Sequence, residues 1–297
     1  MLLGFEEYEI QAQHLAMTLG RSYSRVAVHH FPDGECKVTL PEKLPTHVVF
    51  CRSLDYPNDK LIELLLAATT ARQLGAQRLT LVAPYLCYMR QDTAFVVGEA
   101  VSQPIIGRFL AELFDDVITV DPHLHRTHQL AEAVPATHAV ALTATAIMRE
   151  FLHHHCGAHP ESHADTLLLG PDAESVQWVR ALAEGDGLAY GVARKQRLGD
   201  REIHITLPNL DLEAKAVVLV DDVISSGETI AIAAQACFEK GAKRVDVLVT
   251  HPLFAQGAFE RIRQVGVGEI WSTDSIPHSS NCIVLTKLLA EAVQGIV

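Results

Sequence analysis

The sequence predicts an α/β fold built as two domains of similar size. Short runs of Val, Ile and Leu, apolar on both faces, recur through the whole chain, which is typical of buried strands in parallel sheets. Segments with helical periodicity lie between those runs, so strand and helix alternate. The chain has 297 residues, and this length favours two domains of about 150 residues over one compact core.

Seven apolar runs are expected to form strands, and each ends in polar or turn residues. They are 46–53, 78–85, 116–123, 166–172, 216–222, 244–252 and 269–274. Three segments between them are expected to be helices: 58–76, 102–114 and 227–242. Asn58 is suited to cap the first helix at its start, and Gly75 is suited to end it. Because ligands of open parallel sheets bind beyond the carboxyl ends of the strands, the polar residues after each run are candidates for a site.

Charge and cysteine content narrow the class of protein. The formal net charge of −12 gives no general attraction for nucleic acid, so a phosphate ligand must be held by local basic groups, amide N–H groups or metal ions. The six cysteines form no CxxC pair, which favours reduced thiols in a cytoplasmic protein. No signal peptide is expected, and no apolar run reaches the roughly 18 residues that span a membrane.

The boundary between the two domains is expected near residues 140–165, where the sequence is least regular. Residues 152–165 read LHHHCGAHPESHAD and interrupt the alternation of strand and helix. The prediction is an N-terminal domain over 1–142 and a C-terminal domain over 143–297, with a last helix that can pack on the N-terminal domain. The histidines between 153 and 163 are expected in a solvated loop.

The stretch VVLVDDVISSGETI, residues 217–230, has the composition of a sugar-phosphate site. Asp221 and Asp222 end an apolar run, and carboxylates accept hydrogen bonds from sugar hydroxyl groups. A loop that opens a helix follows, where amide N–H groups and the helix dipole favour an anion. The residues expected to hold a phosphate are Ser225, Ser226, Gly227 and Thr229. The alternative is a strand end whose polar residues only cap the next helix.

This stretch resembles the phosphoribosyl-diphosphate binding motif of type I phosphoribosyltransferases and of ribose-phosphate diphosphokinases. Other segments follow the order of the diphosphokinases over nearly the whole chain. They are FPDGECKVTLPE (31–42), NDKLIELLLAATTARQLGAQRLTLVAPYLCYMRQD (58–92), GEAVS (98–102), VDPHLH (120–125), GPD (170–172), RKQR (194–197), GAKRVDVLVTHPLF (241–254) and TDSIP (273–277). The resemblance implies two similar type I phosphoribosyltransferase-like domains, each with a mainly parallel sheet flanked by helices. GEAVS is similar to the shorter, archaeal-type members.

The resemblance implies a reaction in which the β,γ-diphosphoryl group of ATP moves to the 1-hydroxyl of ribose 5-phosphate. The products are 5-phosphoribosyl 1-diphosphate and AMP. Such an enzyme is a transferase and kinase of nucleotide biosynthesis that uses Mg²⁺, with ATP and ribose 5-phosphate as partners. Two alternatives stay open. A phosphoribosyltransferase does not explain the first 140 residues, and a non-catalytic regulatory paralogue is disfavoured by the retained site residues.

The resemblance also implies catalytic and metal-binding residues. Lys195 and Arg197 match two cations of a loop that closes over the transferring phosphates, and their spacing on an extended segment points both to one side. A solvated basic loop is the alternative for this pair. His123 and Asp172 match residues that hold Mg²⁺ directly or through water. A transition-metal site in HLHRTH, residues 123–128, is the weaker reading of the histidines.

ATP binding is implied for two segments. The matching residues are Arg90, Gln91 and Asp92 in YMRQD, and Phe31, Asp33 and Glu35 in FPDGE. A guanidinium fork suits phosphate, while Phe31 can stack on adenine beside carboxylates that accept from its amine. In the family the 31–35 loop reaches a neighbouring subunit's site, so we expect a homo-oligomer. A turn between two strands is compatible with that role.

Several positions depart from the family's pattern. Thr93 and Ala94 stand where basic residues often follow YMRQD, and Gln196 stands where a further arginine is common. Glu228 stands where a small residue is common in the phosphate loop, and we expect its side chain to point outward at the start of a helix.

Overall fold

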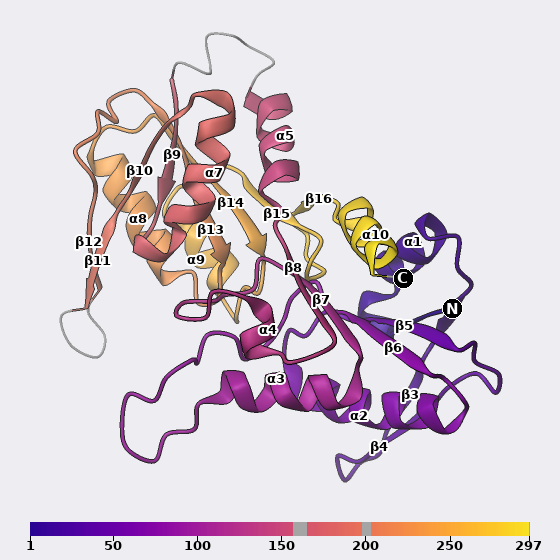
Figure 1. Cartoon of the computed structure of the whole chain (residues 1–297). Helices are drawn as coiled ribbons and strands as arrows, with labels where there is room; N and C mark the ends of the chain where they lie inside the picture. Colours follow the sequence, from indigo (N-terminus) through magenta and orange to yellow (C-terminus); the bar gives the residue numbers. More distant parts are fainter. Residues whose placement is uncertain (157–164, 198–202, 297) are drawn as a thin grey trace. The chain divides into compact units, whose positions relative to one another are not determined.

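The computed structural model describes residues 1–156, 165–197 and 203–296 (Figure 1). The chain divides into two compact units. Unit 1 comprises residues 1–143, 275–277 and 285–297, and unit 2 comprises 144–274 and 278–284. Each unit contains a six-stranded sheet whose neighbouring strands all pair in parallel. The predicted α/β fold with mainly parallel sheets is therefore confirmed.

The sheet of unit 1 has the order β2-β1-β5-β6-β7-β8. Its strands are β1 (Leu2–Gly4), β2 (Tyr23–Arg25), β5 (His47–Cys51), β6 (Arg78–Val82), β7 (Asp116–Val120) and β8 (His138–Leu142). Its helices are η1 (Glu6–Tyr8), α1 (Glu9–Thr18), α2 (Pro57–Gln73), α3 (Ser102–Leu113), α4 (Leu130–Ala133) and α10 (Thr286–Gly295). The apolar runs predicted as strands form its buried centre, where Phe50 on β5 packs edge-on against Phe114, with ring centroids 5.5 Å apart.

Helix α2 begins one residue earlier than the sequence suggested. Pro57 occupies its first turn, and Tyr56, with a φ of 46°, is the N-cap in place of Asn58. Proline suits this position because its φ is already helical and a first-turn N–H has no partner within the helix. Asn58 instead accepts a hydrogen bond from the Tyr88 hydroxyl at 2.5 Å. Gly75 follows the end of the helix with a φ of 96°, as its predicted role requires.

The sheet of unit 2 has the order β10-β9-β13-β14-β15-β16. Its strands are β9 (Thr166–Gly170), β10 (Ala189–Val192), β13 (Ala216–Val223), β14 (Arg244–His251), β15 (Ile270–Thr273) and β16 (Asn281–Ile283). Its helices are α5 (Thr145–Cys156), η2 (Ala173–Ser175), α7 (Val176–Asp186), α8 (Glu228–Glu239) and α9 (Ala258–Gln264). The central strands β9, β13 and β14 are almost wholly buried, as their continuous apolar runs predict.

Each unit also carries a two-stranded antiparallel hairpin. In unit 1, β3 (Ala27–His30) pairs with β4 (Cys36–Thr39), and in unit 2, β11 (Arg194–Arg197) pairs with β12 (Ile203–Thr206). Each hairpin follows the second strand of its unit's sheet. With the hairpins set aside, the strands of the two sheets are arranged in the same order along the chain.

The histidine-rich segment was wrongly expected to be a loop at its start. His153, His154 and His155 form the last turn of α5, where the ring of His155 stacks on Phe151 with centroids 4.0 Å apart. That aromatic contact explains why the helix continues into a polar stretch. Residues 157–164, with the remaining histidines of the cluster, lie outside the described residues. Among the described helices, none has the length and apolar character needed to cross a bilayer.

Candidate active site

The predicted phosphate loop joins β13 to α8 and depends on Gly227. This residue is the N-cap of α8 and has a φ of 72°, a backbone angle that residues other than glycine rarely adopt. A Cβ at this position would lie 3.0 Å from the carbonyl oxygen of Ala258 and 3.1 Å from Cδ1 of Ile262. Both the backbone angle and the close approach of α9 therefore require glycine.

Three carbonyl groups of this loop accept hydrogen bonds from α9 and the segment just before it. The N–H of Phe254 donates to Ile224 at 2.9 Å, and the N–H of Ala255 donates to Ser225 at 2.8 Å. The Arg261 guanidinium donates to the carbonyl of Ser226. Three consecutive carbonyl oxygens thus have protein partners, which fixes the loop at the start of α8. Such a helix start attracts anions.

Glu228, the unusual residue in the loop, is the first residue of α8. Its side chain is exposed, which agrees with the outward orientation that the sequence suggested. An acidic residue in the first turn also suits the helix dipole.

Three carboxylates gather near the end of β13. Asp222 is buried, and Asp221 beside it is partly buried. Removal from water and the nearby charges of Asp222 and Asp172 raise the pKa of Asp221 well above its ordinary value. Asp172, after β9, also caps the short helix η2 by accepting from the N–H of Glu174 at 3.1 Å. The cluster has an excess of negative charge that a bound cation or a hydroxyl-rich ligand would relieve.

Lys195 contacts two residues for which the sequence predicts other roles, Thr229 and Asp172. It lies on β11, and its ammonium group donates to Oγ1 of Thr229 at 2.9 Å and to Oδ2 of Asp172 at 3.4 Å. The predicted catalytic lysine, metal ligand and phosphate-loop hydroxyl therefore meet within unit 2. Arg197 ends the same strand, opposite Ile203, but its side chain lies outside the described part of the chain.

The predicted Mg²⁺ ligands lie in different units. Asp172 is in unit 2 and His123 is in unit 1. Carboxylate oxygens of Asp172 and its acidic neighbours are the donors that a hard cation prefers, so the donor set of unit 2 fits Mg²⁺. In unit 1, Nε2 of His123 lies 2.8 Å from Nε2 of His125, and the two rings meet edge to face.

In unit 1, the predicted ATP-binding residues of YMRQD follow β6. Arg90 is exposed. Gln91 uses both ends of its amide, which accepts from the Ser102 hydroxyl and donates to Glu99, each at 2.8 Å. The other carboxylate oxygen of Glu99 accepts from the N–H groups of Phe95 and Val96 at 2.7 and 3.2 Å. Gln91 and Glu99 thus shape the loop that follows Arg90.

Asp92 has a partner that the sequence analysis did not identify. Its Oδ1 accepts from the Arg126 guanidinium at 2.7 Å, and its Oδ2 accepts from the Arg126 backbone N–H at 3.1 Å. Thr127 donates to Gln103 at 2.9 Å, and Gln103 donates to the Met89 carbonyl at 3.0 Å. The segment after β7, which carries His123, is therefore bonded to the segment after β6.

The predicted adenine-binding residues occupy the exposed tip of the β3–β4 hairpin. The N–H of Phe31 donates to the carbonyl of Glu35 at 2.8 Å, and the N–H of Glu35 donates to Asp33 at 3.1 Å. The ring of Phe31 is exposed and contacts His29 edge-on. No described contact joins this tip to Arg90, Gln91 or Asp92.

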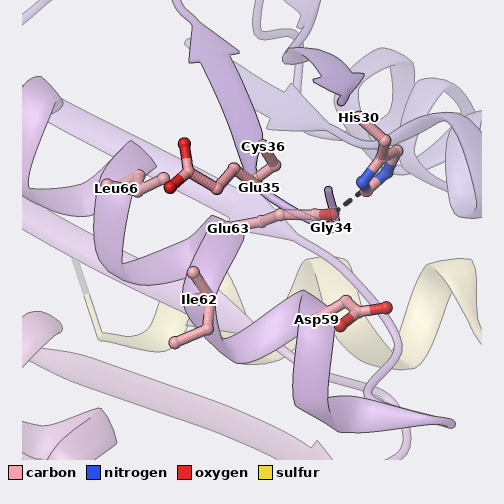
Figure 2. A pocket seen from close by; sticks show the side chains of 8 residues that line it. All are labelled: His30, Gly34, Glu35, Cys36, Asp59, Ile62, Glu63 and Leu66. Carbon is pink, nitrogen blue, oxygen red and sulfur yellow. Dashed lines mark ion pairs between the residues drawn. The ribbon is translucent and has the colours of Figure 1, made fainter. Parts of the chain in front are cut away.

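A pocket of about 350 Å³ lies between this hairpin and α2 (Figure 2). Its lining residues are His30, Gly34, Glu35, Cys36, Asp59, Ile62, Glu63 and Leu66. Of the predicted site residues, only Glu35 lines it. The lining contains three carboxylates and no lysine or arginine, and His30 pairs with Glu63 at 3.4 Å. This chemistry accepts hydrogen bonds from amino groups and disfavours phosphate.

Comparison with known proteins gives one consistent result. Residues 1–117 match the N-terminal domain of ribose phosphate pyrophosphokinase, and residues 205–297 match the phosphoribosyl synthetase-associated domain. The ribose-phosphate pyrophosphokinase of Methanopyrus kandleri is 32% identical over 285 residues, which cover 96% of this chain and 95% of that protein. The enzyme of the same name from Saccharolobus solfataricus is 36% identical over 275 residues, covering 86% and 85%.

A solved structure agrees with these sequence matches. The phosphoribosylpyrophosphate synthetase of Mycobacterium smegmatis superposes with a TM-score of 0.84 over 100% of this chain and 98% of that one, at 22% identity, and shows the same fold. The sequence relatives, which are more than 30% identical over most of the chain, establish more than a fold. The chain belongs to the ribose-phosphate pyrophosphokinase family.

Proposed function

We propose that this protein is a ribose-phosphate diphosphokinase that converts ATP and ribose 5-phosphate into 5-phosphoribosyl 1-diphosphate and AMP. The observation that carries the proposal is the contact of Lys195 with Asp172 and Thr229. This contact lies near the two acids close to the carboxyl end of β13, Asp221 and Asp222. Family membership over nearly the whole chain supports the same activity. A phosphoribosyltransferase is not favoured, because the match includes the N-terminal synthetase domain.

Ribose 5-phosphate is assigned to unit 2. Asp221 and Asp222 accept hydrogen bonds from the ring hydroxyl groups, which are donors. Ser225, Ser226, Gly227 and Thr229 hold the 5-phosphate at the start of α8, where N–H groups and the helix dipole favour an anion. Burial and the nearby charges of Asp222 and Asp172 raise the pKa of Asp221, and hydrogen bonds from sugar hydroxyl groups would stabilise its charged form.

The chemical step needs positioning and charge stabilisation more than a covalent intermediate. The 1-hydroxyl oxygen of the sugar forms a bond to the β-phosphorus, the bond from that phosphorus to the α–β bridging oxygen breaks, and the hydroxyl proton is released. Lys195 and Arg197 stabilise the charge that develops on the phosphate oxygens. Lys195 is already held at the edge of the phosphate loop by Thr229.

ATP is assigned to unit 1. Arg90 binds its phosphates, Gln91 and Asp92 shape the same segment, and Phe31, Asp33 and Glu35 bind adenine. The hairpin tip is exposed, and we propose that it completes the site of a neighbouring subunit in a cytoplasmic homo-oligomer. Bound Mg²⁺ would neutralise charge on the ATP phosphates, with Asp172 and, directly or through water, His123 as its protein ligands.

The test is a direct assay of the purified protein with ATP, ribose 5-phosphate and Mg²⁺. AMP and 5-phosphoribosyl 1-diphosphate should form in equal amounts, and EDTA should abolish the reaction. Absence of AMP, together with release of diphosphate from 5-phosphoribosyl 1-diphosphate and a free base, would establish a phosphoribosyltransferase instead. Activity restored by Zn²⁺ but not by Mg²⁺ would move the metal assignment to the histidines around His123.

A further inference from the structure

Arg126 and Asp92 form an ion pair in which only the cation is accessible. The Arg126 side chain is 66% exposed, whereas that of Asp92 is 5% exposed. Both Asp92 oxygens accept from Arg126, one from the guanidinium and one from the backbone N–H. The described guanidinium contact uses Nη1, and the high exposure of the side chain leaves the rest of the guanidinium accessible to a ligand. A buried carboxylate engaged in this way orients a cation and is a poor ligand for an anion.

The ion pair joins Arg126 to the loop that carries Arg90, and the rest of that loop lacks positive charge. Asp92 follows Arg90 by two residues, and the loop after it begins with Thr93 and Ala94. Arg126 arrives from the loop after β7, the neighbouring strand in the sheet. Two exposed guanidinium groups therefore extend from adjacent strand ends of unit 1, where ligands of parallel sheets bind.

Further hydrogen bonds connect the two loops around the Arg126–Asp92 ion pair. Thr127, next to Arg126, donates to Gln103, which in turn donates to the carbonyl of Met89, next to Arg90. The segments that carry the two arginines are thus hydrogen-bonded to each other, and Arg126 is held by its carboxylate partner before any ligand binds. Preorganised forks of this kind bind phosphate oxygens with little further loss of side-chain freedom.

We propose that Arg126 binds the phosphates of ATP together with Arg90, and that Asp92 is the positioning residue of Arg126. The inference rests on the proposed function and extends it to a residue that the sequence analysis did not select. It also changes the role of Asp92, which acts through the guanidinium and does not contact the nucleotide. Arg126 lies four residues before α4, in a different loop from YMRQD, and it supplies the positive charge that Thr93 and Ala94 lack.

The experiment measures steady-state kinetics of the full-length protein carrying Arg126→Gln, with Arg180→Gln as a matched control. Arg180 is 63% exposed and is also ion-paired, with Glu184 in unit 2. Loss of one charge-assisted contact should raise the KM for ATP by about 10- to 100-fold in Arg126→Gln. The KM for ribose 5-phosphate and the Mg²⁺ concentration for half-maximal activity should stay constant, and Arg126→Lys should recover part of the loss.

A purely structural role gives a different pattern. If Arg126 only held the segment that carries His123, its loss would lower kcat and raise the Mg²⁺ requirement while the KM for ATP stayed constant, and the proposal would be refuted. The double variant Asp92→Asn/Arg126→Gln should be no worse than Arg126→Gln alone, because Asp92 acts through Arg126. If the increases in the KM for ATP of the two single variants multiplied in the double variant, Asp92 would have its own contact with ATP, and its role as a positioning residue would be refuted. Absence of AMP formation by the unaltered protein would refute the proposed function, whereas normal turnover with an unchanged KM in Arg126→Gln would refute only the role of Arg126.

Discussion

The two units share one sheet topology, yet the loop after the third sheet strand differs completely between them. In unit 2, β13 leads into a loop of small residues that ends at Gly227 and α8. In unit 1, β5 leads into Arg52, which is 3% exposed and donates to Glu7 at 2.6 Å and to buried Glu63. Its guanidinium carbon lies 3.8 Å from the centroid of the Phe5 ring. The position that is proposed to bind a phosphate in unit 2 is filled by an internal ion pair in unit 1.

This contrast shows that topology provides a binding position and the loop sequence decides whether it is used. Unit 1 fills the position after its third strand, and its candidate ligand groups come instead from the loops after β6 and β7, with Arg90 and Arg126. In unit 2, Lys195 of β11 contacts Thr229 next to the corresponding loop. If the proposed function holds, the cation at this position is structural in unit 1 and functional in unit 2, so equivalent changes should affect different properties.

The largest effect is expected for Lys195→Ala. Turnover should fall by about 10²- to 10⁴-fold, because the lysine stabilises charge that appears only in the transition state. The affinity for ribose 5-phosphate should change little. Lys215→Ala is the control, since Lys215 forms a surface pair with Asp165 at 2.8 Å in the same unit. A near-normal kcat would return Lys195 to the solvated-loop interpretation.

Arg52→Met should lower the stability of the protein, whereas Lys195→Ala should lower its turnover. Removal of one partner from a buried ion pair typically costs about 3–5 kcal/mol of unfolding free energy, and it would leave buried Glu63 with the exposed His30 as its remaining ion-pair partner among the described residues. Denaturant unfolding checks this value, and the KM for ribose 5-phosphate of the folded fraction should stay constant. If stability were unchanged while turnover fell, unit 1 would have kept a ligand site at this position and the contrast would be wrong.

A smaller effect is expected for Asp222→Asn. The change keeps the shape of the side chain but weakens a charge-assisted hydrogen bond, which is worth about 1.5–3 kcal/mol. Ribose 5-phosphate should bind more weakly, and 2-deoxy and 3-deoxy analogues should bind almost as well as the parent sugar. Calorimetry should show unchanged affinity for ATP without sugar. A collapse of ATP affinity with normal sugar binding would assign the acids to a nucleotide-bound metal.

The smallest effect distinguishes backbone strain from crowding in the phosphate loop. Gly227→Ala and Gly257→Ala both place a side chain at a positive φ, of 72° and 76°, at the N-cap of a helix. The shared strain costs about 1–2 kcal/mol. Only Gly227→Ala also meets neighbouring atoms, since nothing lies within 4 Å of a Cβ at Gly257. Thermal unfolding should show a larger loss for Gly227→Ala, and equal losses would mean that α9 moves aside without cost.

The sequence was sufficient for the features that depend on continuous or local patterns. The central strands of both sheets are long apolar runs, and the phosphate loop is contained within residues 221–229. The strands β1, β2, β8 and β16 were not predicted, because they are short or only partly buried. The roles of Arg52 and Arg126 were also missed. Each depends on a carboxylate from a segment that is distant in the sequence, and a lone arginine after an apolar run does not reveal its partner.

The position of α10 has a consequence for the order in which the molecule is completed during synthesis. This helix, from residues 286–295, belongs to unit 1, where it lies beside α1 and contacts β7 and β8 (Figure 1). Arg78 on β6 also donates to the carbonyl of Ile296 at 2.5 Å. The ribosome makes residues 1–143 of unit 1 first, but one surface of that unit stays uncovered until α10 has emerged. Residues 144–274 and 278–284 of unit 2 all precede α10, so unit 1 gains this helix only after every residue of unit 2 has been made.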